Sequence, residues 1–369
     1  MSTVRVALIM AGGSGDRFWP LSRPDKPKQL LCLTDPRRSL LQVAVERLLP
    51  IFPAERIYVV TSRALEPPLR EALPAIPGAN VIAEPARRNT AGCLCYAAAV
   101  LKHRLGGERV TMAVVTADHR VGDEARFRQT LSGALAVAEG SGALVTLGVR
   151  PTHADAGFGY IEPETLPCHV AGETPGPAVF PVTRFIEKPD AATARRLIAD
   201  GRHLWNSGMF FWELAAFLRE LRSAQPAMAD AVDAMVAGLG GGDAAAVEAA
   251  FARLPDLSID HALMERSRRV LVMPADFDWE DVGSWDALER VWPRDAAGNV
   301  SLGDPVLVDC RDSIVVNEPG APALPVSVVG MRGVIVVCSR EGVLVVPKDR
   351  AQDVRQAVAE LRRRGAARV

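Results

Sequence analysis

The sequence predicts an α/β protein with a mainly parallel β-sheet flanked by helices, followed by a smaller region rich in β-structure. In the first half, short apolar runs with many β-branched residues alternate with longer helical patterns. From about residue 296 the chain changes to short β runs separated by turn residues. A length of 369 residues fits one large domain with a small one appended to it.

The alternating elements of the first half define the sheet. We expect strands at 4–10, 56–61, 80–83, 111–116 and 143–149. Helices are expected between them, near 39–50, 64–73, 90–105 and 124–139. This alternation favours parallel neighbours, and such sheets bind their ligands beyond the carboxyl ends of the strands.

The second half is predicted in less detail. Residues 164–178 are rich in proline and glycine and indicate a hairpin or loop, and the alanine-rich stretch after Trp212 indicates helices with a break at 238–242. A basic amphipathic helix over 349–364 closes the chain, and we expect its arginine-rich face to be solvated or to form a dimer contact. Further strands are expected near 269–274 and at 306–309, 313–316, 326–329, 333–338 and 342–346.

Composition excludes several classes of protein. A formal net charge of −1 and a pI near 6.6 argue against a protein that binds nucleic acid or a membrane surface. No apolar run approaches the ~18 residues of a membrane span, and the start of the chain has no signal-peptide pattern. The six cysteines have neither a disulfide framework nor metal-site spacing, so we expect buried, reduced thiols in a cytoplasmic protein.

The most informative segment follows the first apolar run, which ends at Met10. It is a glycine-rich turn made of Gly12, Gly13, Ser14 and Gly15. Such a turn exposes backbone N–H groups to an anion, and Arg17 and Lys28 add the full charges that a phosphate chain requires. The turn lacks the Gly-Lys-Ser/Thr of a P-loop, and Phe18 stands where a dinucleotide fingerprint has its third glycine. It therefore predicts a distinct type of polyphosphate site.

The pattern G-G-x-G-x-R-F-W-P-x-S-R followed by P-K-Q resembles the opening of the sugar-1-phosphate nucleotidylyltransferases, in particular short, single-function mannose-1-phosphate guanylyltransferases. Further family-like blocks follow in the family's order over roughly residues 4–290, with a weaker match beyond. They are Glu84–Ala91, Ala117–His119, Gly157–Glu162, Phe185–Pro189, Trp205–Phe210, Ser258–Asp260 and Asp281–Trp285. The resemblance implies a Rossmann-like nucleotidyltransferase domain over 1–293. A β-roll or left-handed β-helix-like appendage with a terminal helix would occupy 294–369.

The resemblance also implies a reaction. GTP and α-D-mannose 1-phosphate would give GDP-mannose and pyrophosphate, by attack of the sugar phosphate on the α-phosphorus with Mg²⁺ as cofactor, in a cytoplasmic homodimer. The implied catalytic residues are Arg17, Lys28, Asp118 and Asp281, of which the two aspartates would bind Mg²⁺. By itself, Asp118 could equally be a helix N-cap. Asp281 stands among other acids, so its assignment depends on the D-x-G-x-W context.

Two further groups of site residues are implied. The nucleotide-binding group consists of Gly12, Gly13, Ser14, Gly15, Glu84, Pro85, Asn89, Thr90 and Ala91, and its second half favours guanine. The sugar-phosphate group consists of Gly159, Glu187, Lys188 and Asn206. Glu187 could instead pair with Lys188 or a surface arginine. We expect His119, Trp205 and Trp212 to pack within the protein.

Two alternatives stay open at this point. The enzyme could use another sugar 1-phosphate, such as a heptose phosphate, or another nucleotide. The chain could also be a catalytically silent regulatory subunit that binds a nucleotide sugar. The intact set of Arg17, Lys28, Asp118, Lys188 and Asp281 argues against the silent subunit, because a binding protein could lose these charges.

Overall fold

The computed structural model describes residues 3–13, 15–168, 178–318 and 324–366. The chain divides into two compact units. The first unit is formed by Met1–Met10, Val45–Thr116 and Gly122–Asp278, and the second by Ala11–Ala44, Ala117–Val121 and Trp279–Val369. The domain boundary expected at residue 293 stays a prediction.

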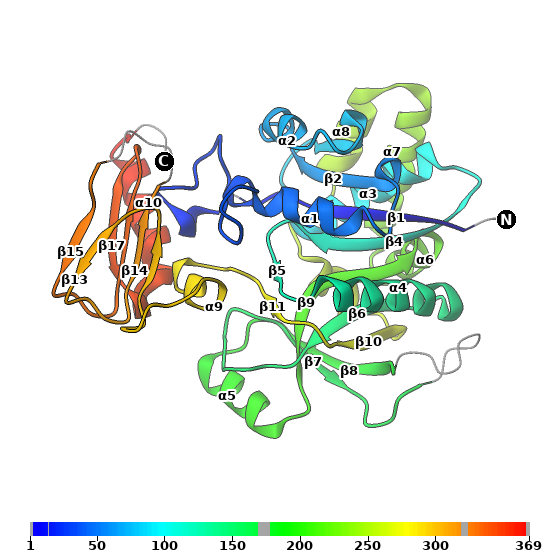
Figure 1. Ribbon diagram of the computed structural model, residues 1–369. Helices are drawn as coiled ribbons and strands as arrows, with labels where there is room; N and C mark the ends of the chain where they lie inside the picture. The colour runs from blue at the N-terminus through cyan, green and yellow to red at the C-terminus, as the bar shows by residue number, and fades with distance from the viewer. Residues whose placement is uncertain (1–2, 14, 169–177, 319–323, 367–369) are drawn as a thin grey trace. The chain divides into compact units, whose positions relative to one another are not determined.

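The first unit is built on a mixed nine-stranded sheet with the order β3-β2-β1-β4-β9-β6-β10-β8-β7 (Figure 1). The strands are β1 (Thr3–Met10), β2 (Ile57–Ser62), β3 (Val81–Glu84), β4 (Arg109–Thr116), β6 (Leu144–Val149), β7 (Tyr160–Pro163), β8 (Phe180–Ile186), β9 (Leu204–Glu213) and β10 (Val270–Ala275). Strands β3, β2, β1 and β4 are parallel, as their strand–helix spacing predicts. Met10 pairs with Thr116, so the segments that follow β1 and β4 begin side by side.

The other half of the sheet is mixed. Strand β9 runs antiparallel to both β4 and β6, while β10 is parallel to β6. The sequence analysis did not assign β7, β8 or β9. Most of β9 is buried, so its sequence LWNSGMFFWE does not show the apolar–polar alternation that marks a half-exposed strand.

Helices cover both faces of this sheet. Helices α3 and α7 share the largest apolar cluster with Phe210 and Trp212 of β9, whereas α4 packs on the opposite face against β4, β6 and β9 (Figure 1). A helix break was expected over residues 238–242. In the structure α7 continues through most of this range and ends at Gly241, followed by Gly242 with a φ of 68°. The helices are α2 (Glu66–Ala72), α3 (Asn89–Arg104), α4 (Glu124–Ser141), α5 (Ala191–Asp200), α6 (Leu214–Ala224), α7 (Pro226–Gly241) and α8 (Ala244–Ala252), and α1 (Leu40–Leu48) contributes to both units.

The second unit contains the β-rich region. Strands β12, β14 and β16 form a parallel sheet that β17 extends in the antiparallel sense, and β13 pairs with β15 in parallel. Its strands are β5 (Arg120–Val121), β11 (Trp279–Glu280), β12 (Val300–Leu302), β13 (Val306–Val308), β14 (Ile314–Asn317), β15 (Ser327–Val329), β16 (Val334–Cys338) and β17 (Val343–Pro347). Helices α9 (Leu288–Val291) and α10 (Val354–Arg363) complete it. Successive parallel strands of three to five residues are typical of a β-helix, as expected.

The glycine-rich turn belongs to the same unit as this β-helix. Phe18 and Trp285 share a buried apolar cluster with Ile335 of β16 and Val354 of α10. The indole N–H of Trp285 donates to the backbone oxygen of Trp19 at 3.1 Å. The first turn, the Asp281–Trp285 segment and the β-helix therefore form one packed structure.

Most of the cysteine and tryptophan side chains expected to be buried are buried. Four of the six cysteines are buried, but Cys32 is exposed and Cys168 is partly exposed, and all six are free. Trp205 and Trp212 are buried, as expected. Part of the loop expected over 164–178 and the predicted site residue Ser14 lie outside the described residues. Within the described residues, no helix combines the length and the apolar character that crossing a bilayer requires.

Candidate active site

The glycine-rich turn passes very close to Lys28. Gly15 has a φ of 70°, and a Cβ atom on it would lie 2.5 Å from the Cβ of Lys28 and 2.8 Å from its backbone nitrogen. Only a glycine permits both the left-handed conformation and this approach. Ser22 fixes the turn by donating its hydroxyl to the Gly15 oxygen at 2.6 Å.

Lys28 connects two aspartates that are distant in the sequence. It lies in the short helix η2 (Lys28–Leu30) and is buried. Its Nζ donates to Oδ2 of Asp118 at 2.8 Å and to the backbone oxygen of Asp281 at 2.9 Å. The structure thus brings three of the four predicted catalytic residues together within one unit.

The two aspartates experience different electrostatic environments. Burial, with smaller contributions from Glu280 and Asp118, raises the pKa of Asp281 to about 7, although the charge of Lys28 opposes the shift. For Asp118, burial also opposes ionisation, but the charges of Lys28 and His119 together with the hydrogen bond from Lys28 outweigh it, and the pKa lies below its usual value. Lys28 therefore favours the charged form of both carboxylates, but at Asp281 burial and the neighbouring acids prevail over it.

The fourth catalytic candidate, Arg17, lies beside these groups. Burial lowers its pKa, while the charges of Asp281 and Asp118 act in the opposite direction. A Cβ atom on Gly283 would lie 2.8 Å from Oδ2 of Asp281 and 3.4 Å from Nη1 of Arg17. A glycine at this position thus leaves room for the guanidinium and the carboxylate together.

The predicted nucleotide-binding block Glu84–Ala91 lies in the first unit. Glu84 ends β3 and is buried, and burial raises its pKa to about 7. Among the described residues, its Oε2 atom has no hydrogen-bond partner. Such a buried acceptor carries an energetic cost of about 1–3 kcal/mol unless a ligand or water satisfies it.

The residues after Glu84 are attached to a second segment of the first unit. Asn89 has a φ of 54°, and its side-chain oxygen accepts from the backbone N–H of Thr90 at 2.9 Å. The Thr90 hydroxyl accepts from the N–H of Ile259 at 2.8 Å, and the N–H of Ala91 donates to Leu257 at 3.2 Å. The nucleotide block is therefore fixed to the segment that leads into Asp260.

The predicted sugar-phosphate residues also lie together in the first unit. A Cβ atom on Gly159 would lie 2.5 Å from Oε2 of Glu187 and 3.4 Å from the Cβ of Asn206. Glu187 pairs with Lys188, since Oε1 accepts from Nζ at 2.7 Å. The ion pair that the sequence analysis gave as an alternative role for Glu187 is thus present, and the other carboxylate oxygen lies beside Gly159.

Asp260 is a member of this cluster that sequence reasoning did not assign. Asn206 donates its amide to Oδ1 of Asp260 at 2.7 Å. Burial and then the negative charge of Glu187 raise the pKa of Asp260 to about 6. Asp260 begins the irregular helical turn η5 (Asp260–Met264). Its place in the Ser258–Asp260 block was the signal that the sequence offered.

Comparisons with known proteins identify the family of this chain. Residues 6–297 match the nucleotidyl transferase family, and residues 303–361 match the MannoseP isomerase/GMP-like beta-helix domain. The mannose-1-phosphate guanylyltransferase of Escherichia coli K12 is 36% identical over 363 residues, which cover 97% of this chain and 73% of that protein. This chain belongs to the mannose-1-phosphate guanylyltransferase family. The resemblance found in the sequence motifs is thereby confirmed.

Other relatives extend across both units. The xanthan biosynthesis protein XanB of Xanthomonas campestris is 38% identical over 362 residues, covering 97% of this chain and 73% of that protein. A crystal structure from Thermus thermophilus, described as a mannose-1-phosphate geranyltransferase, matches with a TM-score of 0.85 and 36% identity. The match covers 97% of this chain and 99% of the other. Both matches therefore span the nucleotidyl transferase and β-helix regions of this chain.

The nucleotidyl transferase family generally uses a divalent metal ion, and two residues of this chain fit one. No group of three or more His, Cys, Asp or Glu side chains suited to a metal occurs in the described part of the chain. Mg²⁺ does not need such a group, because one or two carboxylates with substrate phosphates and water suffice. Asp118 and Asp281 provide two closely placed carboxylates, and their mutual repulsion is a cost that a cation would relieve.

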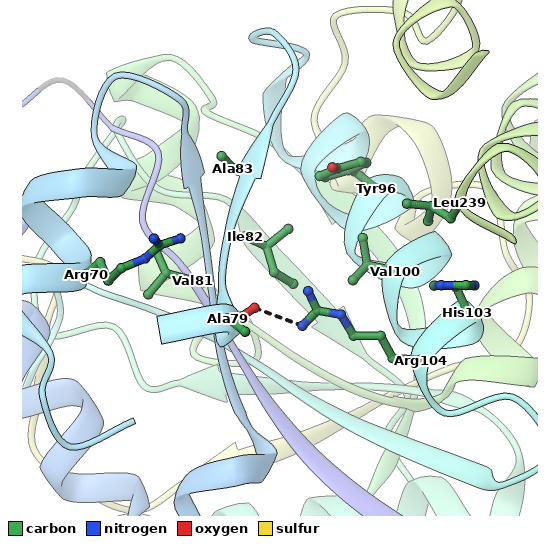
Figure 2. A pocket seen from close by; sticks show the side chains of 10 residues that line it. All are labelled: Arg70, Ala79, Val81, Ile82, Ala83, Tyr96, Val100, His103, Arg104 and Leu239. Carbon is green, nitrogen blue, oxygen red and sulfur yellow. Dashed lines mark hydrogen bonds between the residues drawn. The ribbon is translucent and has the colours of Figure 1, made fainter. Parts of the chain in front are cut away.

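A cavity elsewhere in the first unit contains none of these residues. It has a volume of about 440 Å³ and lies over the edge strand β3 (Figure 2). Arg104 borders it and donates to the Ala79 oxygen at 2.9 Å. Its remaining walls are formed by Arg70, Val81, Ile82, Ala83, Tyr96, Val100, His103 and Leu239.

Proposed function

We propose that this chain transfers a guanylyl group from GTP to α-D-mannose 1-phosphate and so forms GDP-mannose and pyrophosphate. The observation that carries the proposal is the group of Arg17, Lys28, Asp118 and Asp281, in which two cations face two carboxylates beside a glycine-rich turn. Membership of the guanylyltransferase family supports the choice of nucleotide and sugar.

In this proposal the chain provides charge and position rather than a nucleophile. A phosphate oxygen of the sugar 1-phosphate attacks the α-phosphorus of GTP in line, and pyrophosphate leaves. Lys28 lies beside the α-phosphate, where negative charge shifts during transfer, and Arg17 holds the departing β- and γ-phosphates. Preorganised cations of this kind stabilise the transition state without reorganising during the reaction.

Asp118 and Asp281 would hold Mg²⁺. When bound, the ion supplies positive charge to the phosphate oxygens and orients them. The backbone oxygen of Asp281 and the side chain of Asp118 fix Lys28, so the same residues that would bind the ion also set the position of the lysine. Binding Mg²⁺ and holding Lys28 are compatible roles for Asp118 and Asp281, because both the ion and the lysine place positive charge near the two carboxylates.

The first unit would provide recognition. Glu84, Pro85, Asn89, Thr90 and Ala91 would bind the nucleotide, and the buried oxygen of Glu84 supports a hydrogen bond with a ligand. Gly159, Glu187, Lys188 and Asn206 would bind mannose 1-phosphate, with carboxylate and amide groups directed to hydroxyls and the ammonium to the phosphate. Because Gly159 has no side chain, Glu187 and Asn206 can both approach the backbone at this point, and their closeness supports the assignment.

One assay tests the proposal directly. Pyrophosphate release is measured with each of the four nucleoside triphosphates against mannose, glucose, galactose and heptose 1-phosphates, with and without Mg²⁺. We expect the highest kcat/KM for GTP with mannose 1-phosphate. A clear preference for a heptose phosphate or for another nucleotide would show that the proposed substrates are wrong. The absence of turnover with every pair would contradict the proposed reaction. The cytoplasmic location and the homodimer stay predictions.

A further inference from the structure

The C-terminal helix reaches the phosphate-binding turn. Gln352, in the helical segment η7 (Lys348–Asp353), accepts from Nη1 of Arg17 at 3.1 Å. The same amide donates through Nε2 to the hydroxyl of Ser284 at 2.8 Å. Gln352 therefore connects Arg17 to the segment that contains Asp281, entirely within the second unit.

A second contact lies further along the helix. Arg362 of α10 binds both carboxylate oxygens of Asp16, at 3.1 and 3.0 Å. Asp16 directly precedes Arg17, so the helix holds the turn at two points. A bidentate pair of this kind fixes orientation as well as distance.

Arg355 lies between these two contacts. Arg355 and Arg362 are seven residues apart in α10, which is about two turns, so they share one side of that helix, and Gln352 lies in η7 directly before it. Arg355 is exposed, and it has no ion-pair partner among the described residues. Its charge is close enough to Arg17 to oppose the protonation of that guanidinium. Two neighbouring cations, of which Arg355 has no ion pair among the described residues, favour the binding of an anion.

The opposite sides of the helix have other functions. Val354 and Val358 are buried in the apolar cluster with Phe18 and Trp285. Arg363 pairs with Glu360 on the solvent side, and its Nη2 lies 2.6 Å from that carboxylate. The arginines of this helix therefore differ in their contacts: Arg362 binds the glycine-rich turn through Asp16, whereas Arg363 pairs with Glu360 at the surface.

We propose that Gln352, Arg355 and Arg362 complete the triphosphate site: Gln352 and Arg362 position Arg17, and Arg355 adds a phosphate-binding cation. The proposal depends on the guanylyltransferase reaction only for the identity of the ligand, which is a pyrophosphate group, free or as part of GTP. The β-helix unit is then a contributor to phosphate binding rather than a passive appendage.

Binding of inorganic pyrophosphate with Mg²⁺ to the full chain, measured by calorimetry, tests Arg355 without requiring turnover. We expect Arg355→Ala to weaken binding about tenfold, the value for one lost charge-assisted contact, and Arg355→Lys to restore part of it. Arg363→Ala is the matched control, since it removes the same charge from the same helix, and should bind as the wild type does. Equal binding by Arg355→Ala and Arg363→Ala would overturn the proposal, as would a wild-type chain that does not bind pyrophosphate.

Gln352 requires a different readout because it acts through Arg17. We expect Gln352→Ala to raise KM for GTP, and for pyrophosphate in the reverse reaction, by about three- to tenfold, with KM for mannose 1-phosphate unchanged. A uniform loss of activity with lowered thermal stability would instead assign Gln352 a purely structural role and overturn its part. If pyrophosphate binding responds as expected but no GDP-mannose forms, the proposed reaction fails while this inference stands.

Discussion

The side-chain amide of Asn206 donates to Oδ1 of Asp260 at 2.7 Å across 54 positions of sequence. This contact joins the sugar-binding candidates to the segment that also holds Thr90. The polar side chain of Asn206 is therefore oriented before any sugar binds, and its geometry is a property of the folded first unit.

Changing these residues should alter sugar selectivity. We expect Glu187→Gln and Asn206→Ala to lower kcat/KM for mannose 1-phosphate and to reduce discrimination against glucose 1-phosphate, with little change in GTP affinity. When the wrong epimer binds, the protein groups that should hydrogen-bond its hydroxyl are left without a partner. Each such buried group raises the free energy of the complex by about 1–3 kcal/mol, so the site discriminates against that sugar. The ratio of kcat/KM for the two sugars is the measurement, with the exposed Asp200→Asn as control. An unchanged ratio, or a collapse of GTP binding, would place the sugar elsewhere.

Asp118→Asn and Asp281→Asn should each lower the Mg²⁺-dependent kcat by about 10²-fold or more, while the fold is retained. Each substitution takes a negative charge from a phosphate-bound ion. Turnover is measured across a Mg²⁺ titration, with circular dichroism as the check on folding. Asp276→Asn is the control, because this nearby acid is exposed and pairs with Arg126. Near-normal turnover at limiting Mg²⁺ would remove the altered residue from the metal site.

Lys28→Ala should lower kcat more than it raises KM for GTP. The positive charge of Lys28 matters most in the transition state, where negative charge shifts between the phosphates. Loss of one such group typically lowers kcat by about 10²–10³-fold. Steady-state kinetics with GTP as the varied substrate separate the two parameters. An effect confined to KM would make Lys28 a ground-state binding residue.

Gly15→Ala should disturb the same lysine through the backbone. The added Cβ would lie 2.5 Å from the Cβ of Lys28, at a φ of 70° that costs a non-glycine residue roughly 1–2 kcal/mol. We expect a lower midpoint in urea denaturation together with reduced kcat. Gly13→Ala is the stability control, since a Cβ there meets nothing within 4 Å. Equal stability of the two variants would show that the turn can adjust.

Glu84 should make stability depend on pH. Burial raises its pKa from 4.5 to about 7, so between these values the folded state keeps a proton that the unfolded chain has released. Stability then falls as pH rises through this interval, and the full cost is present above pH 7. We expect Glu84→Gln to be more stable than the wild type by roughly 1–2 kcal/mol at pH 8, with the difference shrinking toward pH 5. Urea denaturation across this range tests the sign, and a constant difference would contradict it.

The sequence predicted the elements whose patterns are local. The apolar run before Met10, the glycine turn and the strand that ends at Thr116 were all readable, because periodicity and glycine placement are short-range signals. The largely buried strand β9 was not assigned, since burial on both faces removes the apolar–polar alternation. Gln352 and Asp260 were also missed. Their roles depend on contacts with Arg17 and Asn206 that lie far away in the sequence and leave no local pattern.

Arg17 and Gln352 are 335 positions apart, and this separation has a consequence for biosynthesis. A ribosome that adds about 5–20 residues per second needs roughly 20–70 s to translate the interval. Throughout that time the emerging chain has its glycine turn without the helix that holds Arg17. A nascent chain therefore cannot form this contact before Gln352 has been translated. A chain truncated just before Gln352 would keep every strand of the nine-stranded sheet, but its phosphate-binding turn would lack that support.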